Sequence, residues 1–203
     1  MNMRKLRTIE MNRLSVDEFR QAEKLPLAVV LDNVRSLHNV GAVFRSSDAF
    51  RVQKVILCGI TARPPHKDIH KTALGAEDSV AWEYHADACD AVSKLRDEGW
   101  FVYAVEQTEG SENLQNLHLN HCPDGRKPAG YAVVLGNEVK GVQQSVIDLC
   151  HACLEIPQYG TKHSLNVSVA AGIVIWDFAR RMALSMPGGA AGISVQKNFP
   201  NRP

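Results

Sequence analysis

The sequence predicts an α/β protein, in which a doubly wound parallel β-sheet is flanked by helices. Four continuous apolar runs have the length and composition of strands that are buried on both faces: residues 27–31, 55–58, 101–105 and 132–135. Helical patterns separate these runs, and such alternation is typical of a parallel sheet covered by helices. A chain of 203 residues is long enough to bury the core of a single domain.

The first element is a basic helical arm, assigned to residues 1–25. Ser15 and Glu18 have the spacing of a capping box, which predicts a short helix ahead of Pro26. The first apolar strand then opens a domain that we assign to residues 26–185.

Four helices and a weaker strand complete the predicted domain. The helices are expected at residues 40–50, 87–98, 143–149 and 165–184, and the weaker strand at residues 80–84. Asn39 is the expected cap of the first of these helices and Ser164 of the last. The last helix is apolar on nearly every side, so it is expected between other elements or at a subunit interface. Buried Asn166 and Ser168 would each need a hydrogen-bond partner.

Composition excludes several other classes of protein. There is no run of about 18 apolar residues, and the first residues lack the apolar stretch of a secretory signal, so a cytoplasmic location is expected. The five cysteines are interpreted as reduced thiols. Neither the phosphate loop of nucleotide triphosphatases nor the usual dinucleotide fingerprint occurs. Residues 186–203 carry glycine and proline without periodicity and are expected to form a flexible tail.

Charge is segregated along the chain although the net charge is only +1. Residues 45–71 hold six basic and two acidic side chains, whereas residues 77–112 hold two basic and ten acidic ones. The arm is also basic. This pattern fits a face that meets a polyanion, and it also fits the uneven scatter of charge over solvated helices.

Three polar segments follow predicted strands, where ligands bind in open α/β sheets. The first contains Asn39, Gly41 and Arg45, the second is the loop 136–141, and the third is the segment 156–168. Taken singly, each has an ordinary structural explanation, such as a helix cap with an exposed arginine or a turn with an exposed glutamate.

Taken together and in order, the three segments resemble the three motifs of the SpoU (TrmH-like) branch of the SPOUT RNA methyltransferases. The resemblance covers residues 27–181. It implies a deep trefoil knot at the carboxyl end of the domain, an exception to the rule that chains do not thread loops. It also implies S-adenosylmethionine bound in the knot, a tRNA or rRNA substrate, and a homodimer packed through helices near the knot.

The resemblance carries roles onto individual residues. The catalytic set that it implies is Arg45, Asn39, Glu138, Ser164 and Asn166. The cofactor-binding set, which acts largely through backbone groups, is Leu135, Gly136, Asn137, Ile156, Leu165 and Asn166. Two departures from the family pattern are Gln158, where many relatives have methionine, and His163 before Ser164.

The implied reaction transfers a methyl group from a sulfonium to a ribose 2′-hydroxyl, a very weakly acidic nucleophile. Arg45 is the candidate for stabilising the developing oxyanion, because an arginine with a pKa above about 12 is a poor general base. Asn39, Glu138 and Ser164 are expected to align the reacting groups. No metal is required.

The resemblance also gives the basic segments a purpose, since they could contact RNA phosphates. The residues expected to do so are Arg4, Lys5, Arg7, Arg13, Lys67 and Lys71, with Arg51, Lys54 and Arg63 as further candidates. Residues 66–71 are interpreted either as a substrate loop or as a surface segment that happens to carry histidines.

Two alternative functions differ in class. One is an RNA-binding module that keeps the fold without the chemistry. The other is a small zinc-binding protein that would use His118, His121, Cys122, Cys150, His151 and Cys153. Against the second, residues 150–153 lead directly into an apparent strand.

Overall fold

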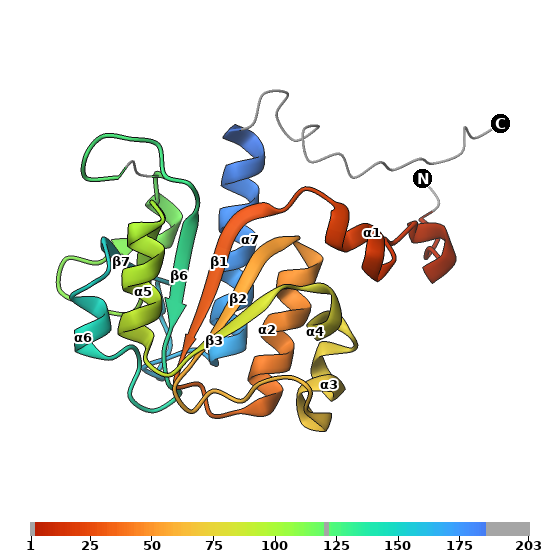
Figure 1. Ribbon diagram of the computed structural model, residues 1–203, viewed down its shortest axis with the longest axis horizontal. Coiled ribbons are helices and arrows are strands. Elements are labelled where there is room, and N and C mark those ends of the chain that lie inside the picture. The colour runs from red at the N-terminus through yellow and green to blue at the C-terminus, as the bar shows by residue number, and fades with distance from the viewer. Residues whose placement is uncertain (1–2, 120–121, 186–203) are drawn as a thin grey trace.

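The computed structural model describes residues 3–119 and 122–185 and shows a seven-stranded sheet between two layers of helices (Figure 1). The predicted tail, residues 186–203, lies outside the described residues. In sequence order the strands are β1 (Leu25–Asp32), β2 (Val52–Cys58), β3 (Trp82–His85), β4 (Phe101–Val105), β5 (Glu112–Asn113), β6 (Tyr131–Leu135) and β7 (Ala152–Glu155).

The strand order across the sheet is β3-β2-β1-β6-β4-β7-β5, and every neighbouring pair is parallel. The predicted parallel α/β sheet is therefore confirmed. Strand β6 lies between β1 and β4, although all of β2 to β5 separates it from β1 along the chain. The carboxyl ends of β1 and β6 are thus adjacent. The strand order does not trace how the chain passes through itself, so the trefoil knot stays a prediction.

The helices are α1 (Val16–Gln21), α2 (Leu37–Ala49), α3 (Lys67–Ala73), α4 (Ala76–Ser79), α5 (Ala88–Asp97), α6 (Gln144–Ile147) and α7 (Val167–Ser185), with 3₁₀ turns η1 (Thr8–Met11) and η2 (Leu114–Asn116). Two predicted caps are wrong. Ser36, not Asn39, caps α2, since its hydroxyl accepts a hydrogen bond from the Asn39 amide at 3.3 Å. Asn166, not Ser164, precedes α7, and its side-chain oxygen accepts from the Ser168 amide at 2.9 Å.

Other predictions need smaller corrections. The segment 66–71 is not a loop, because it forms most of α3 with the His66 ring as its cap. The arm ends before Leu25, so Pro26 lies inside β1 instead of following a helix. The capping box of α1 is confirmed, with the Ser15 amide donating to the Glu18 carboxylate at 2.7 Å.

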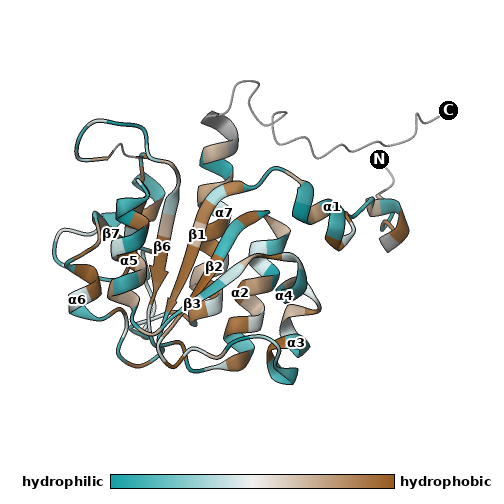
Figure 2. Ribbon diagram, viewed as in Figure 1, coloured by the Kyte–Doolittle hydropathy of each residue, from teal (hydrophilic) through white to brown (hydrophobic). Residues whose placement is uncertain are grey.

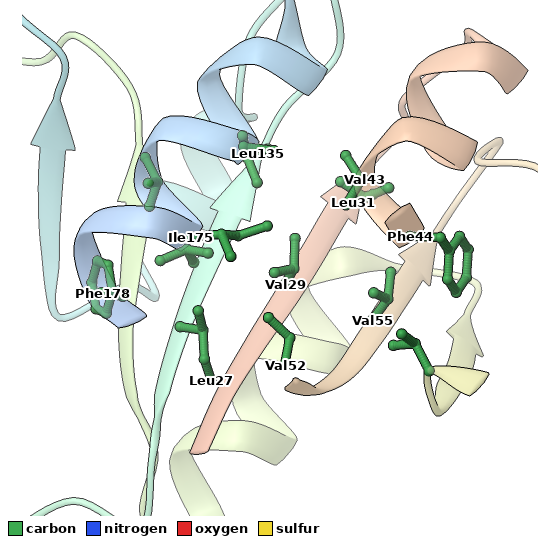
Figure 3. Packing of buried hydrophobic residues seen from close by; sticks show 14 of the residues in the cluster. Leu27, Val29, Leu31, Val43, Phe44, Val52, Val55, Leu135, Ile175 and Phe178 are labelled. Carbon is green, nitrogen blue, oxygen red and sulfur yellow. The ribbon is translucent and has the colours of Figure 1, made fainter. Parts of the chain in front are cut away.

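The sheet is apolar on both faces because the central strands are rich in valine, and Figure 2 shows β1 and β6 as hydrophobic along most of their length. Side chains alternate between the faces, so Val29 packs toward α2 and α7 while Val30 packs toward α5. Figure 3 shows the first of these layers, where Val29 lies among Val43, Ile175 and their neighbours. Burial on both faces explains the absence of polar alternation in the strand sequences.

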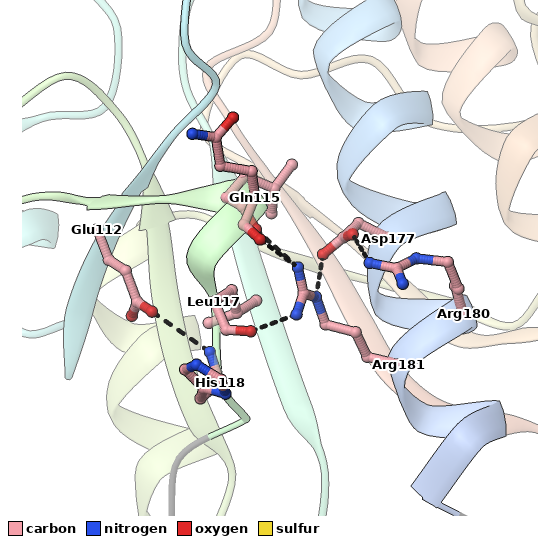
Figure 4. A network of polar contacts seen from close by, with 8 residues as sticks. Glu112, Gln115, Leu117, His118, Asp177, Arg180 and Arg181 are labelled. Atoms are coloured by element: carbon pink, nitrogen blue, oxygen red, sulfur yellow. Dashed lines mark hydrogen bonds and ion pairs between the residues drawn. The ribbon is translucent and has the colours of Figure 1, made fainter.

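Helix α7 is fastened to the segment between β5 and β6 by a polar network (Figure 4). The Arg181 guanidinium pairs with the Asp177 carboxylate and donates to the backbone oxygens of Leu117 and Leu114, the latter at 2.9 Å. This network fixes the carboxyl half of α7 against the sheet. Among residues 3–119 and 122–185, no helix is both long and apolar enough to cross a bilayer.

Candidate active site

The three polar segments singled out in the sequence converge at the carboxyl ends of the strands. The Glu138 carboxylate, in the loop after β6, accepts hydrogen bonds from the backbone amides of Arg35 and Ser36, each at 3.0 Å. These amides follow β1, the neighbour of β6 in the sheet. Glu138 therefore clamps the first segment to the second.

Asn39 is the centre of a hydrogen-bond chain that joins all three segments. Its side-chain amide donates to the Glu138 carboxylate at 3.0 Å, and its side-chain oxygen accepts from the Asn166 amide at 3.1 Å. Because α2 begins two residues before Asn39, the Asn39 side chain is buried, with 8% exposure, instead of capping the helix. Asn166 is exposed, contrary to the prediction that it is buried, yet it has partners in Asn39 and Ser168.

The pKa of Glu138 is lowered. Partial burial opposes ionisation of this carboxyl, but the hydrogen bonds from Arg35, Ser36 and Asn39 together outweigh that effect. A single carboxylate accepts all of these hydrogen bonds. Glu138 is therefore an ionised anchor for the first segment.

The loop after β6 is held in one conformation. The Asn137 side-chain amide donates to the Asn33 backbone oxygen at 2.8 Å, and its oxygen accepts from the amides of Val139 and Lys140. Gly136 faces the far end of this loop so closely that a Cβ added there would lie 2.1 Å from the Gly141 carbonyl carbon. Only glycine permits this approach.

Sequence reasoning missed two carboxylates that support the same loop. Asp32 is fully buried at the end of β1 and accepts from the Gln143 side-chain amide at 3.1 Å. Glu106, just after β4, accepts from the Val142 amide at 2.9 Å. The available signal was the carboxylate directly following each apolar run, at the edge where the ligands of α/β sheets bind.

The backbone positions predicted to bind a cofactor surround the ends of β6 and β7. These strands flank β4, so Gly136 and Ile156 are one strand apart. Three of these positions lie outside the paired stretches of the strands: Gly136, Ile156 and Leu165. Among the described residues, their backbone groups take part in none of the backbone hydrogen bonds that form turns and loops. Gly136 and Ile156 are half-buried, and half-buried backbone groups outside the strand ladders favour a polar ligand.

Two predicted catalytic residues are not part of the hydrogen-bonded cluster. Arg45 lies on α2 about 9 Å along the axis from Asn39 and about 120° around it, so it points elsewhere. It is exposed, and within the described ranges no carboxylate lies at ion-pair distance from it. Ser164 is exposed in the loop before α7.

The predicted phosphate contacts fall into two groups. Lys67 and Lys71 are exposed on α3, and Lys71 pairs with Asp68 at 2.6 Å. The residues of the arm are Arg4, Lys5, Arg7 and Arg13, all of them exposed. The arm lies beside α4, near the end of the sheet where β1 begins, away from the carboxyl ends of the strands (Figure 1).

One further candidate is unsuited to phosphate binding. The Lys54 side chain is only 18% exposed, and its ammonium pairs with the Glu83 carboxylate at 3.1 Å and with Glu98 at 3.7 Å. Its positive charge is therefore already matched.

An exposed apolar stripe runs along α7 and the residues before it. It consists of Leu165, Val169, Ile173 and Trp176, whose side chains are between 37% and 55% exposed. The Trp176 ring lies against Phe50, at the end of α2, with ring centroids 5.7 Å apart. The predicted helix is thus buried on one side only.

The residues proposed for zinc do not gather. Of the described His, Cys, Asp and Glu side chains, no three form a group that could hold a metal ion, and His121 lies outside them. The His151 ring instead stacks on Phe101 and accepts from the Val102 amide at 3.0 Å.

Comparison with known proteins finds one family and several similar proteins. Residues 26–176 match the model of the SpoU rRNA Methylase family. The chain is 30% identical over 172 residues to the tRNA (guanosine(18)-2′-O)-methyltransferase of Thermus thermophilus, covering 85% of this chain and 84% of that protein. It is also 30% identical over 159 residues to the 23S rRNA (guanosine-2′-O-)-methyltransferase RlmB of Neisseria meningitidis, covering 78% of this chain but only 60% of that protein.

The chain also has a fold similar to that of solved RNA-modifying enzymes. A TrmH/SpoU tRNA modifying enzyme from A. aeolicus aligns with a TM-score of 0.68 at 26% identity, covering 82% of this chain and 81% of that one. The AdoMet-bound rRNA methyltransferase of Sinorhizobium meliloti aligns with a TM-score of 0.69 at 28% identity, covering 82% of this chain and 61% of that one.

Proposed function

Since the chain belongs to the SpoU rRNA methylase family, we propose that it transfers a methyl group from S-adenosylmethionine to a ribose 2′-hydroxyl of tRNA or rRNA. The observation that carries this proposal is the hydrogen-bond chain Glu138–Asn39–Asn166. It ties together, at the ligand-binding edge of the sheet, one residue from each of three segments within the matched span. Two relatives of this chain are named as guanosine 2′-O-methyltransferases, one of tRNA and one of 23S rRNA.

The donor set fits the adenosyl cofactor, which supplies the electrophilic methyl group when bound. Backbone groups beyond the strand ladders at Gly136, Ile156 and Leu165 are the kind of donors and acceptors that a purine and a ribose require. The Asp32 and Glu106 carboxylates hold the loop that carries Gly136 in place. We assign cofactor binding to Leu135, Gly136, Asn137, Ile156 and Leu165, with Asn166 at the boundary with the substrate.

We propose that Arg45 contacts the substrate hydroxyl. Its exposed guanidinium is free to stabilise the oxygen as negative charge develops in the transition state. Asn39, Glu138 and Asn166 act as positioning residues, since their mutual hydrogen bonds set the entry into α2 and the start of α7. Ser164 completes the proposed set from the exposed loop before α7. The cytoplasm is the proposed location, which agrees with the five free thiols.

We propose further that two copies of the chain pair through the apolar stripe on α7. Helices α2 and α7 pack together, with Ser46 beside Gly172, so Arg45 on α2 lies next to this stripe. Pairing would cover Trp176 and bring Arg45 to the subunit boundary. Replacing Ile173 with Glu should convert the dimer into a monomer in light scattering, whereas replacing exposed Tyr159 with Glu should not.

The activity is tested by incubating the purified chain with labelled S-adenosylmethionine and unmodified tRNA or rRNA transcripts. We expect a 2′-O-methylated nucleoside, identified by mass spectrometry of the digested RNA, and no label with the Arg45→Ala variant. RNA that binds without gaining label would favour the non-catalytic binding module. Label on a base would contradict the ribose assignment.

A further inference from the structure

A pocket opens at one edge of the sheet, apart from the hydrogen-bonded cluster. It has a volume of about 590 Å³, within the range of small-ligand pockets, and is lined by the loop after β2 and by β3. Two aromatic rings, Trp82 and Tyr84, line it. Both belong to β3, one of the two edge strands of the sheet. Each is 38% exposed.

The two rings lie on the same face of β3, because side chains two residues apart on a strand point the same way. Trp82 pairs in register with Val55 and Tyr84 with Leu57, and both partners belong to the layer under α2 and α7. On the inner strands this layer is covered by helices, but at the outermost strand the rings stay partly open. They form an aromatic platform, defined as Trp82 and Tyr84.

A cation accompanies the platform. The Arg63 guanidinium lies 4.3 Å from the centroid of the Tyr84 ring. It is exposed, and among the described residues no carboxylate lies at ion-pair distance from it. His66 and Lys67 follow Arg63 after two prolines, and His66 also lines the pocket. Aromatic faces beside positive charge match the chemistry of a nucleotide, which has a flat base and an anionic phosphate.

The pocket is connected to the candidate active site through hydrogen bonds. The Ile60 amide, at the start of the loop that lines the pocket, donates to the Asn33 side-chain oxygen at 3.2 Å. The Asn33 backbone oxygen accepts from Asn137 at 2.8 Å. Thr61 is buried and accepts from the Val34 amide at 2.9 Å. The loop that lines the pocket and the loop after β6 are therefore both hydrogen-bonded to the short segment between β1 and α2.

We propose that the platform binds one unpaired nucleotide of the RNA substrate, near the nucleotide that is methylated, with its base stacked on Trp82 or Tyr84 and its phosphate against Arg63. This inference rests on the proposed RNA methyl transfer. It differs from the apolar stripe on α7, where exposed Arg180, four residues after Trp176, is already paired with Asp177 at 2.9 Å; that stripe suits a second copy of the chain. The platform selects the shape of the RNA by requiring an unstacked base.

The direct test is photocrosslinking of the full chain to a short single-stranded RNA that contains 5-iodouridine. We expect mass spectrometry to locate the crosslinked base on Trp82 or Tyr84. Crosslinks found only elsewhere would overturn the proposal. The measurement needs no cofactor, so a chain that crosslinks here without transferring methyl groups would contradict the proposed activity and leave the platform standing.

Matched variants test the energetic role. Stacking on one ring contributes about 1–3 kcal/mol, so the double variant Trp82→Ala/Tyr84→Ala should bind the same RNA at least about fivefold more weakly. The control Trp82→Phe/Tyr84→Phe keeps an aromatic ring at each position, although it shortens the Trp82 indole and removes the hydrogen bond from Tyr84 to the Gly59 oxygen, so its affinity should change far less than that of the alanine variant. Equal affinity of the alanine variant and the parent would refute the platform.

A third variant covers the case in which the alanine variant fails to fold, as judged by circular dichroism. Arg63→Gln removes the cation from an exposed position and keeps both rings. It should weaken RNA binding and reduce its dependence on salt. Unchanged affinity and salt dependence would contradict the role given to the phosphate.

Discussion

The side-chain amides of Asn39 and Asn166 are joined by a hydrogen bond of 3.1 Å across 127 residues of sequence. One lies in the first turn of α2 and the other directly before α7. Since Asn39 also donates to Glu138, this bond links the start of α7 to the loop after β6. The two helices and the loop therefore keep a fixed relative position at the carboxyl edge of the sheet.

Coupling between Asn39 and Asn166 should be measurable in a double-mutant cycle. Each single alanine variant should lower kcat by about 10- to 100-fold, because misplacement of about 1 Å at a reacting centre has effects of that size. The double variant should lose little more than either single one, as expected when two residues act through one shared bond. Strictly additive losses in kcat would show that the bond does not couple them.

Glu138→Gln should destabilise the fold in a pH-dependent way. The pKa of Glu138 is lowered in the folded state, so the carboxylate contributes stability that is fully present above its unfolded pKa of about 4.5 and is lost as the pH falls through the folded value. Urea unfolding of both proteins should show a gap at neutral pH that closes in acid. A gap that is constant over this range would show that the charge of Glu138 is not what stabilises the loop.

Arg45→Ala should reduce kcat by about 100- to 1,000-fold, the usual effect of removing one donor to a developing oxyanion. Affinity for S-adenosylmethionine should stay nearly unchanged, because Arg45 contacts none of the proposed cofactor groups. Isothermal titration with the cofactor and single-turnover kinetics with RNA separate these effects. Near-normal turnover would exclude the assigned role.

Gly136→Ala should destabilise the protein and abolish cofactor binding. The added Cβ would meet the backbone of Gly141 and Val142 at 2.1–2.3 Å, so the loop must move, at an expected loss of about 1–3 kcal/mol. Gly160→Ala is the matched control, because a Cβ there meets nothing within 4 Å. Thermal melts of both variants, with and without cofactor, provide the measurement; equal melting temperatures would contradict the steric argument.

Removal of residues 1–13 should flatten the salt dependence of RNA binding. This change deletes Arg4, Lys5, Arg7 and Arg13, and every RNA phosphate that is then no longer neutralised lowers the slope of log affinity against log salt by somewhat less than one. In the free protein Arg4 and Arg7 pair with Glu10, so RNA must compete with that carboxylate. The measurement is RNA affinity against salt concentration for the full and the shortened chain. Equal slopes would show that the arm does not contact phosphate.

The central strands were predictable because burial on both faces leaves a plain apolar run, as in β1 and β6. Strand β5 was not predicted, since its two residues are polar. Helix α3 was not, because its charged residues follow two prolines and resemble a loop. The cap of α2 was misplaced for a physical reason. Ser36 and Asn39 are both good capping residues, and only the tertiary partner of Asn39 decides between them.

The pairing of Glu138 with Arg35 and Ser36 lay beyond any local pattern. It depends on β6 lying beside β1, which the order of elements along the chain does not state. The resemblance to a family predicted which residues form the site. The hydrogen bonds between these residues could be found only from the folded structure. Asp32 and Glu106 were missed because a single carboxylate after a strand has no distinctive spacing.

The central place of β6 also fixes when the site can form during synthesis. Until residues 131–135 leave the ribosome, the facing edges of β1 and β4 have no partner, and exposed strand edges invite pairing with other chains. The cluster then needs Asn166, which emerges later still. A nascent chain therefore acquires its chemistry in a single late step, and truncated products should be inert and prone to aggregate.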